Sequence, residues 1–529
     1  MADSDFVIVG AGSAGCALAA RLSEDPGRTV TLIEAGGSNR HPSVIVPLAF
    51  SQQFGSGRDW AFETEPEPFC HDRRLFVPRG KGLGGSSAMN AMLYVRGRPL
   101  DYDLWERDGC PGWGWEGVEP YFLKSEDSVR GHTENHATGG PLRVEGPRSP
   151  RQVSAAFIES AEASGIPFTD DYNGTEQDGV SVPQVTQKAG RRWSSADAFL
   201  KPAMKRANLT VLTGLEVERV AIEDGRATGV VCRDRRGRER VVTAGREVVL
   251  AAGAIGSPHL LLHSGIGPAS MLADAGIEQV AESPGVGENL QDHPSVVCVW
   301  DMPGGGSLAD AEKPKALLEW ILRRTGPLTS SLAEGFAFVR SRPGLPAADI
   351  QFHFAPAYFV DHGRVTYEGH ASTIGPVLVS PKSRGRLWVE SADPAEPPKF
   401  VTNMLSERED VDALVTGVEI ARDIASHRPL AELLGEELLP GPAIEDREAI
   451  EEDLRERVET LYHPVGTCRM GSDERAVVDP ELRVRGVDRL RVADASIMPL
   501  IPGGNTNAPS IMIGEKAADL IARPAAVPA

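Results

Sequence analysis

The chain has 529 residues and a mass of 56.6 kDa, a length that suits two large domains or three to four small ones. Its 75 acidic residues outnumber 55 basic ones, and the formal net charge of −20 argues against general nucleic-acid binding and against broad adhesion to anionic lipid. A hydrophobic content of 41%, without any apolar run long enough for a membrane span, predicts a globular protein.

The cysteine pattern and the first residues indicate the compartment. None of the six cysteines forms a Cys-x-x-Cys pair, so neither a zinc ribbon nor a disulfide scaffold is expected. The first residues lack the basic region of a signal peptide. We therefore expect a cytoplasmic protein, and peripheral contact with the inner membrane stays open as an alternative.

Residues 6–34 predict a nucleotide-binding unit. Apolar runs at 6–9 and 29–33 are typical of buried strands, and residues 16–23 between them are typical of a helix. The first run enters the turn Gly10-Ala-Gly12-Ser13-Ala14-Gly15, and the second ends in Glu34. In such a turn the glycines allow the tight bend, close approach of a pyrophosphate, and close helix–strand packing. Glu34 would accept hydrogen bonds from ribose hydroxyls, but this unit alone does not distinguish FAD from NAD.

Three further segments extend this pattern along the chain. Residues 79–97 contain a run in which six of the eight residues from Gly80 to Ser87 are Gly or Ser. Residues 251–268 follow a strand-like stretch and are again rich in glycine. Near the C-terminus, a Tyr-His-Pro stretch at 462–464 precedes Gly503-Gly-Asn505-Thr-Asn507. Taken singly, the glycine-rich runs are also compatible with simple hinges.

Together these segments resemble the glucose–methanol–choline family of FAD oxidoreductases, over nearly the whole chain. Both family signatures are recognisable, around 80–97 and 253–268, and the loop 285–293 also fits. Within the family the chain looks most similar to choline-dehydrogenase-like and aliphatic alcohol dehydrogenases. The resemblance implies an α/β fold: a Rossmann-like FAD-binding domain made of discontinuous segments, and a substrate domain with a mostly antiparallel sheet.

The resemblance also implies FAD as the cofactor and a set of residues around it. In some relatives a histidine of the first signature holds the flavin covalently, but the matching position here is Met89, so noncovalent FAD is expected. The residues expected to contact FAD are Gly10, Gly12, Ser13, Ala14, Gly15, Glu34, Gly82, Gly84, Gly85, Ser86, Asn90, Met92, Val217, Asp494, Ala495 and Asn505.

Two residues near the C-terminus are the expected catalytic pair. His463 is the expected base, because an imidazole titrates near neutrality and can take a hydroxyl proton. Asn507 matches the family's second catalytic position, where an amide can hydrogen-bond the substrate oxygen. Residues 509–521 predict a helix, so Asn507 is also interpretable as its N-terminal cap.

Candidate substrate contacts are less specific. Glu334 falls where choline-type relatives carry a carboxylate that meets a quaternary ammonium. Similar aliphatic alcohol dehydrogenases also carry Glu there, and the side chain is also interpretable as hydrogen-bonded internally. His353 stands between two phenylalanines and either faces a substrate cavity or lines a sheet. His259 and His263 have the spacing of metal ligands but enclose three leucines, so they are interpreted as core and no metal site is expected. His293 and His362 receive no role.

The discontinuous motifs predict the domain organisation. Segments 1–150, 195–295 and 460–529 are assigned to the FAD-binding domain, and 151–194 and 296–459 to the substrate domain. Strand-like stretches at 349–354, 374–380 and 385–390 would belong to the antiparallel sheet of the substrate domain. The acidic residues 445–459 predict a solvated helix.

The predicted function is oxidation of a primary alcohol to an aldehyde. His463 would take the hydroxyl proton, hydride would pass to flavin N5, and electrons would pass to a quinone or another acceptor. Three alternatives stay open: an oxidase that uses oxygen, a choline dehydrogenase, and a hydroxynitrile lyase that binds FAD without redox turnover. The substrate would be a small alcohol, and the sequence gives no oligomeric state.

Overall fold

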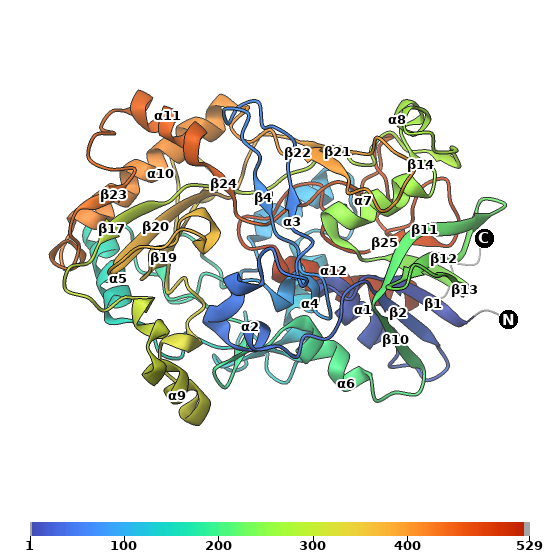
Figure 1. Cartoon of the computed structure of the whole chain (residues 1–529), viewed down its shortest axis with the longest axis horizontal. Helices are drawn as coiled ribbons and strands as arrows, with labels where there is room; N and C mark the ends of the chain where they lie inside the picture. The colour runs from blue at the N-terminus through green and yellow to red at the C-terminus, as the bar shows by residue number, and fades with distance from the viewer. Residues whose placement is uncertain (1–2, 523–529) are drawn as a thin grey trace.

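The computed structural model describes residues 3–522, which form two parts arranged along the long axis of the molecule (Figure 1). The right-hand part in that view is built on a mixed sheet and the left-hand part on an antiparallel sheet. The α-helices of the described chain are α1 (Ser13–Leu22), α2 (Pro42–Ile45), α3 (Pro99–Arg107), α4 (Trp115–Ser125), α5 (Gln152–Ala163), α6 (Lys201–Ala203), α7 (Gly253–His263), α8 (Ala269–Asp274), α9 (Pro314–Arg323), α10 (Arg408–Ser426), α11 (Arg447–Arg457) and α12 (Asn507–Ala522).

The mixed sheet gathers strands from distant parts of the sequence. In spatial order its strands are β10 (Leu209–Thr213), β2 (Val30–Glu34), β1 (Ser4–Val9), β13 (Glu239–Leu250), β12 (Arg226–Asp234) and β11 (Leu215–Glu223), with β25 (Leu490–Val492) also paired to β13. The strands β10, β2, β1, β13 and β25 run parallel, whereas β13, β12 and β11 form an antiparallel meander. Parallel strands joined by helices are the Rossmann-like arrangement expected from the sequence.

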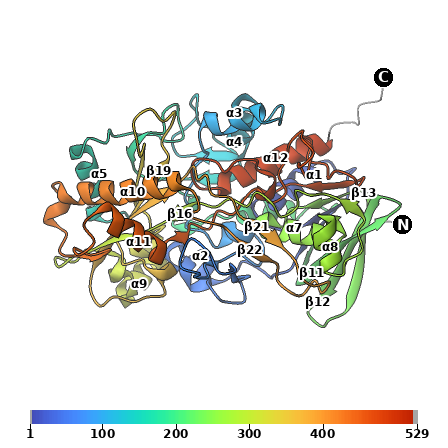
Figure 2. The ribbon, with the colours of Figure 1, turned by 90° about the horizontal axis from the view of Figure 1, so that it is seen from above.

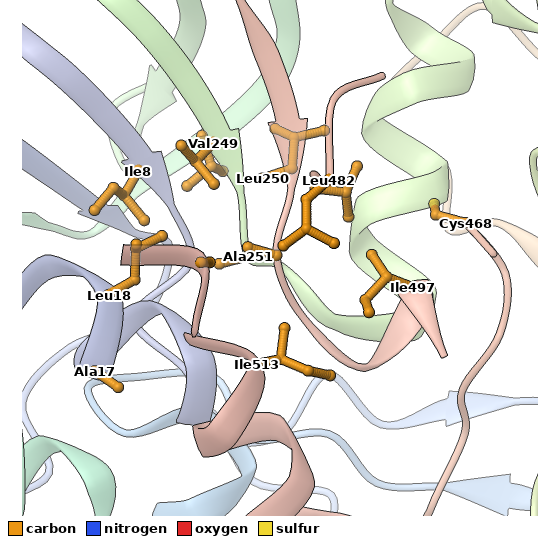
Figure 3. Close-up of a cluster of buried hydrophobic side chains, with 14 of the residues drawn as sticks. Ile8, Ala17, Leu18, Val249, Leu250, Ala251, Cys468, Leu482, Ile497 and Ile513 are labelled. Carbon is orange, nitrogen blue, oxygen red and sulfur yellow. The ribbon is translucent and has the colours of Figure 1, made fainter. Parts of the chain in front are cut away.

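Packing around this sheet brings the two ends of the described chain together. β1 and β2 are almost wholly buried, which explains their continuous apolar sequences. Figure 3 shows Ile8 of β1, Leu18 of α1 and Ile513 of α12 in one hydrophobic cluster beside Val249 and Leu250 of β13. Because α1 and α12 pack against each other, the C-terminal segment is held over the turn that follows β1.

The second sheet is antiparallel. Its strands are β23 (Glu437–Leu439), β17 (Cys298–Asp301), β20 (Ala371–Leu378), β19 (Ile350–Ala355), β18 (Gly335–Val339) and β7 (Gly179–Ser181), with β16 (Pro294–Ser295) and β24 (Glu459–Thr460) at its border. The helices α10 and α5 pack against it and enclose a second hydrophobic core (Figure 2). The predicted α/β fold with a mostly antiparallel second sheet is confirmed, whereas the exact domain boundaries stay predictions.

Five two-stranded sheets complete the described fold. They pair β3 (Phe62–Glu63) with β4 (Phe76–Val77), β5 (Glu126–Ser128) with β6 (Leu142–Val144), β8 (Gln187–Lys188) with β9 (Arg191–Arg192), β14 (Ile266–Gly267) with β15 (Ala281–Glu282), and β21 (Arg386–Trp388) with β22 (Lys399–Val401). The predicted strand at 385–390 therefore does not join the second sheet. Leu387 is instead buried in the core of the first part, next to α7, which explains its apolar pattern.

Other elements follow the sequence with small shifts. The predicted helix at 16–23 begins earlier, at Ser13, and the acidic stretch forms α11. Among residues 3–522, no helix is long and apolar enough to cross a lipid bilayer.

Candidate active site

Two glycines of the turn after β1 are required by the packing of the protein itself. Gly10 has a φ angle of +101°, and a Cβ atom there would lie 2.4 Å from the carbonyl oxygen of Ala251. A Cβ atom on Gly15 would lie 1.9 Å from the carbonyl oxygen of Gly10. These contacts hold the turn, the start of α1 and the end of β13 close together.

Gly12 differs, because its missing side chain leaves free space. The nearest atom to a Cβ there would be 4.0 Å away, and Gly12 lines a cavity. The helix α1 starts directly after it without a side-chain cap, and Ser13 and Ala14 of its first turn line the same cavity. The uncapped N–H groups and the positive helix end fit a bound pyrophosphate.

Glu34 closes this end of the cavity from the tip of β2. Its two carboxylate oxygens accept hydrogen bonds from the backbone N–H groups of Ala11 and Gly36, each at 2.9 Å. Burial raises the pKa of this carboxyl group. The side chain is fixed by the backbone and borders the cavity, a position from which it can accept from ribose hydroxyls.

The second glycine segment packs directly on the first. The N–H of Gly84 donates to the carbonyl oxygen of Ala11 at 2.8 Å, and a Cβ atom on Gly85 would lie 2.7 Å from the Cα of Gly12. Gly82 approaches the carbonyl oxygen of Gly37 in the same way, with 3.0 Å for a Cβ atom. The segment is therefore anchored by close contact between two backbones.

A third anchor comes from the C-terminal segment. The buried carboxylate of Asp494 accepts hydrogen bonds from the N–H of Gly253 at 2.9 Å, from the Ser257 hydroxyl at 2.5 Å, and from the N–H and hydroxyl of Ser496. It ties the start of α7 to the segment before α12. Burial raises the pKa of Asp494, and these hydrogen bonds oppose that shift.

One continuous cavity of about 800 Å³ joins these anchors to the predicted catalytic residues. The sequence-predicted residues that line it are Gly10, Gly12, Ser13, Ala14, Glu34, Gly85, Ser86, Asn90, Val217, His353, His463, Asp494, Ala495, Asn505 and Asn507. The remaining ones do not line it: Gly15, Gly82, Gly84, Met92 and Glu334. The three glycines act through backbone packing, and Met92 is fully buried behind the cavity wall.

His463 lines the cavity just after β24, and it is held by residues of the loop that precedes β16. Its backbone N–H donates to Asp292 at 2.8 Å, and its Nδ1 atom lies 3.0 Å from the Nδ1 atom of His293. Burial lowers the pKa of His463 well below its usual value, and His293 and Arg79 lower it further. A buried imidazole of low pKa is neutral near pH 7, the form that can accept a proton.

Asp292 organises this corner of the site. Its carboxylate accepts hydrogen bonds from the N–H groups of His293 and His463 and from the Thr460 hydroxyl. Burial raises the pKa of Asp292 to about 6, although these hydrogen bonds and Arg79 favour the charged form. Arg79 in turn donates to the carbonyl oxygen of Tyr462 at 2.6 Å, next to His463.

Asn505, rather than Asn507, contacts the predicted base. The Asn505 Nδ2 atom lies 3.3 Å from the Nε2 atom of His463, and the Gln351 amide donates to Asn505 Oδ1, also at 3.3 Å. Asn507 is the first residue of α12, and its amide oxygen accepts from the Ser13 hydroxyl at 2.7 Å. Asn507 thus links the starts of α12 and α1, whereas Asn505 is the asparagine that lies beside His463. The catalytic role expected for Asn507 stays a prediction.

Of the two predicted substrate residues, only His353 faces the cavity. It lies on β19, where alternation turns Phe352 and Phe354 into the core. Its ring stacks on Phe336 with a centroid distance of 4.9 Å, and burial lowers its pKa to about 3. No described residue hydrogen-bonds its Nε2 atom.

Glu334, which was considered as a substrate contact, does not line the cavity. Its carboxylate accepts hydrogen bonds from the N–H of Arg151 at 2.6 Å and from the hydroxyls of Ser154 and Ser330 at 2.8 and 2.6 Å. It therefore caps the start of α5 from the inside, and it is only 1% exposed. Of the two interpretations of Glu334 from the sequence, the one with internal hydrogen bonds agrees with these contacts.

His259 and His263, which were interpreted as core, pack against each other, and one of them also borders the cavity. The rings of His259 and His263 stand edge to face, 4.5 Å apart, and His259 borders the cavity with a pKa lowered to about 3 by burial. Asp361, His362 and Glu459 have potential ligand atoms within 4.8 Å of one another, a grouping that the sequence did not suggest. His362 is already hydrogen-bonded to the Tyr462 hydroxyl at 2.6 Å.

Sequence reasoning missed Asp292, His293 and Gln351. The loop 285–293 was recognised as part of the family pattern, but its last two residues received no role. An acidic residue directly before a histidine, at the end of a glycine-containing loop, was the available signal. Gln351 had no signal, because only the pairing of β19 places it beside the C-terminal segment.

Comparisons with known proteins agree with this geometry. Family models described as GMC oxidoreductase match residues 4–295 and 381–514. An alcohol dehydrogenase [acceptor] of Pseudomonas putida is 43% identical over 98% of this chain and 96% of its own length. An oxygen-dependent choline dehydrogenase of Rhizobium etli is also 43% identical, over 98% and 95%. A structure of Aspergillus oryzae formate oxidase, which concerns FAD modification, has a TM-score of 0.92 at 29% identity and 98% coverage of both chains.

Proposed function

Because the chain belongs to the GMC oxidoreductase family, we propose that it oxidises a primary alcohol to an aldehyde and passes the electrons to a quinone or another acceptor. FAD is the cofactor, as expected from the sequence and in agreement with the family and its FAD-containing structural relatives. Bound FAD supplies the hydride acceptor of this reaction.

The chain's own residues suit that cofactor. Gly12, Ser13 and Ala14 would hold the pyrophosphate, Glu34 the ribose, and Val217 the adenine end. The segment from Gly85 to Asn90 and the residues Asp494 and Ala495 border the other stretch of the cavity. Met89 also borders it, and its thioether is no substitute for a linking histidine, which supports noncovalent FAD.

The hydrogen bonds that connect Gln351, Asn505, His463 and His293 are the main support for the proposal. The Gln351 amide donates to Asn505 Oδ1, which turns the Asn505 N–H group toward His463 Nε2. An Nε2 atom that accepts this contact is unprotonated, so the proton of a neutral His463 lies on Nδ1 and is donated to His293. The Nε2 lone pair therefore faces the Asn505 N–H group, and His463 and Asn505 both line the cavity. A substrate hydroxyl that replaces Asn505 at Nε2 can pass its proton to this nitrogen.

Asn505 can serve the substrate oxygen at the same time. An amide N–H near Nε2 would donate to the oxygen of an alcohol placed for proton transfer, and would hold that oxygen as negative charge develops on it. His353, with an Nε2 atom free of hydrogen bonds from described residues, offers a further polar contact from β19. Removal of one such donor from an active site typically costs a factor of about 100 to 1,000 in rate.

Choline is the second candidate substrate, favoured by the relative named choline dehydrogenase. The carboxylate first suggested for the cation, Glu334, is directed away from the cavity. Asp361 and Glu459 border the cavity and leave a cationic substrate feasible.

Anaerobic titration of the holoenzyme tests the proposal. Flavin absorbance is recorded while a medium-chain primary alcohol is added, with choline in a parallel cuvette. Bleaching by the alcohol supports the proposal, and fast recovery on admission of air would identify an oxidase. Bleaching by choline alone would make choline the substrate, and no bleaching by a panel of alcohols would favour a redox-silent lyase.

A further inference from the structure

The helix α9 presents its apolar side to solvent. Leu317, Leu318, Ile321 and Leu322 are 50%, 58%, 51% and 71% exposed, and together they make one patch, because residues four apart on a helix are neighbours. A helix on the surface of a globular protein normally turns such residues inward. We call these four residues the α9 patch.

The opposite side of α9 attaches it to the protein. Ala316 and Trp320 are buried, and the Trp320 indole N–H donates to the carbonyl oxygen of Gly190 at 2.9 Å. The Arg324 guanidinium lies over the Trp320 ring at 3.9 Å. These contacts orient the helix, so the α9 patch is held outward by the fold rather than by chance side-chain rotation.

Cations flank the α9 patch at both ends of the helix. Lys315 and Arg323 are exposed, while the acidic residue of the helix, Glu319, is half-buried and accepts a hydrogen bond from Thr325. Just before the helix, Lys313 is paired with Asp310 and Glu312 is exposed, so the basic residues next to the patch itself are Lys315 and Arg323. Apolar residues between exposed basic ones are typical of helices that lie in the interface of an anionic membrane.

The helix also projects from the body of the protein. In Figure 1 it stands at the lower left edge, beyond the second sheet, and it lies at the margin in Figure 2 as well. The net charge of −20 opposes approach to anionic lipid, but charges farther than a Debye length of about 8 Å are largely screened at physiological salt. The local cations of a projecting helix can therefore decide its contact.

From these observations we propose that α9 docks the protein on the surface of an anionic lipid bilayer, with the α9 patch in the acyl–headgroup boundary. A second copy of the chain fits less well, because four aliphatic side chains supply far less than the roughly 800 Å² per partner of a standard protein interface. The flanking cations would also repel their own copies across a twofold axis, whereas anionic headgroups would pair with them.

Docking through α9 would place the substrate end of the cavity near the bilayer. The short helix at Pro327–Thr329 packs against α9, and Leu332 and Ala333, which follow it, line the cavity. An apolar alcohol or a membrane-borne acceptor would then reach the cavity from the lipid phase. The docking itself goes beyond the proposed function and does not depend on it.

Vesicle co-sedimentation of the FAD-loaded protein tests the proposal. We expect binding to phosphatidylcholine vesicles that contain about one third phosphatidylglycerol, and weaker binding to phosphatidylcholine alone. The double substitution L318E/L322E should weaken binding about tenfold or more, because two exposed apolar side chains become charged. Replacing the cations, in K315Q/R323Q, should weaken binding to the anionic vesicles and remove most of its salt dependence.

A matched control carries the same change in charge elsewhere. Val241 and Val280 are 49% and 48% exposed and lie on the first part, so V241E/V280E should bind vesicles like the wild type. Circular dichroism and FAD absorbance verify folding, and dye-coupled turnover in solution should stay unchanged in L318E/L322E. Three results would overturn the proposal. They are no vesicle binding by the wild type, an equal loss of vesicle binding in L318E/L322E and V241E/V280E, or a wild-type dimer that dissociates only in L318E/L322E.

Discussion

The Nδ1 atoms of His463 and His293 lie 3.0 Å apart, with the two rings at an interplanar angle of 87°. Two nitrogens at this distance share one proton, so when both rings are neutral one nitrogen donates and the other accepts. Because Asn505 N–H lies against His463 Nε2, the shared proton belongs to His463. The arrangement prepares Nε2 of His463 as the proton acceptor before any substrate is present.

The two asparagines before and at the start of α12 should differ in their effects. Asn505→Ala removes the amide beside His463 and should slow substrate-driven flavin reduction by about 100-fold or more, as expected for loss of a hydrogen bond to developing charge. Asn507→Ala should instead weaken FAD retention or shift the flavin spectrum, because Asn507 joins Ser13 at the start of α1. Stopped-flow reduction and FAD titration of both variants separate the roles. The opposite pattern would favour Asn507 as the catalytic residue and contradict the role proposed for Asn505.

The pH dependence of flavin reduction follows from the burial of His463. Its pKa lies well below 6.5, and only the neutral form accepts a proton. The rate of reduction should therefore be constant from about pH 7 upward and fall as the pH drops through the lowered pKa of His463. Single-turnover rates between about pH 5 and about pH 9 check this. A rate that keeps rising through neutrality would indicate a base with a normal or raised pKa.

The glycine-rich turn offers a matched pair of substitutions. Gly12→Ala should leave the fold intact, since the nearest atom to the new Cβ is 4.0 Å away, but should weaken FAD binding by about tenfold or more. Gly15→Ala would place a Cβ 1.9 Å from the carbonyl oxygen of Gly10 and should prevent stable folding. Circular dichroism of the apoproteins and FAD titration distinguish the two. Normal FAD affinity in Gly12→Ala would contradict a pyrophosphate at this turn.

Glu334 should matter for stability rather than for substrate choice. Glu334→Gln leaves the N–H of Arg151 or a serine hydroxyl facing an amide N–H, at a cost of about 1–3 kcal/mol in the free energy of unfolding. Thermal unfolding of the holoenzyme should show a lower Tm. The ratio of kcat/KM values for an alcohol and for choline should stay the same, and a selective loss of choline turnover would return Glu334 to a substrate role.

How far the sequence could predict the structure depended on the range of the interactions. The turn at 10–15 and the strands beside it were predictable, because their glycines and apolar runs serve local backbone geometry and burial. The segment at 385–390 has an equally clear strand pattern. Such a pattern indicates that side chains are buried, but it does not indicate which strand or core they pack against. It packs in the first core because Leu387 donates its N–H to the carbonyl of Gly287, a contact across a hundred residues.

The candidate site shows the same limit at the level of single side chains. Asn505 and Asn507 stand two residues apart at a helix start, where such neighbours point in different directions. Resemblance selected the segment, but only the positions of His463 and Ser13 decide which amide faces which partner. Glu334 is a similar case. Its carboxylate is hydrogen-bonded by Ser154 at the start of α5, a residue 180 positions away that the local sequence does not indicate.

His463 is the residue that we propose takes the substrate proton. The most direct test of this role is anaerobic stopped-flow reduction of His463→Ala by the best alcohol found for the wild type. We predict that FAD stays bound with a normal oxidised spectrum, while the reduction rate falls by about 100- to 10,000-fold, the usual contribution of a general base. Reduction within a few-fold of the wild-type rate would contradict the account and require a different base in the cavity.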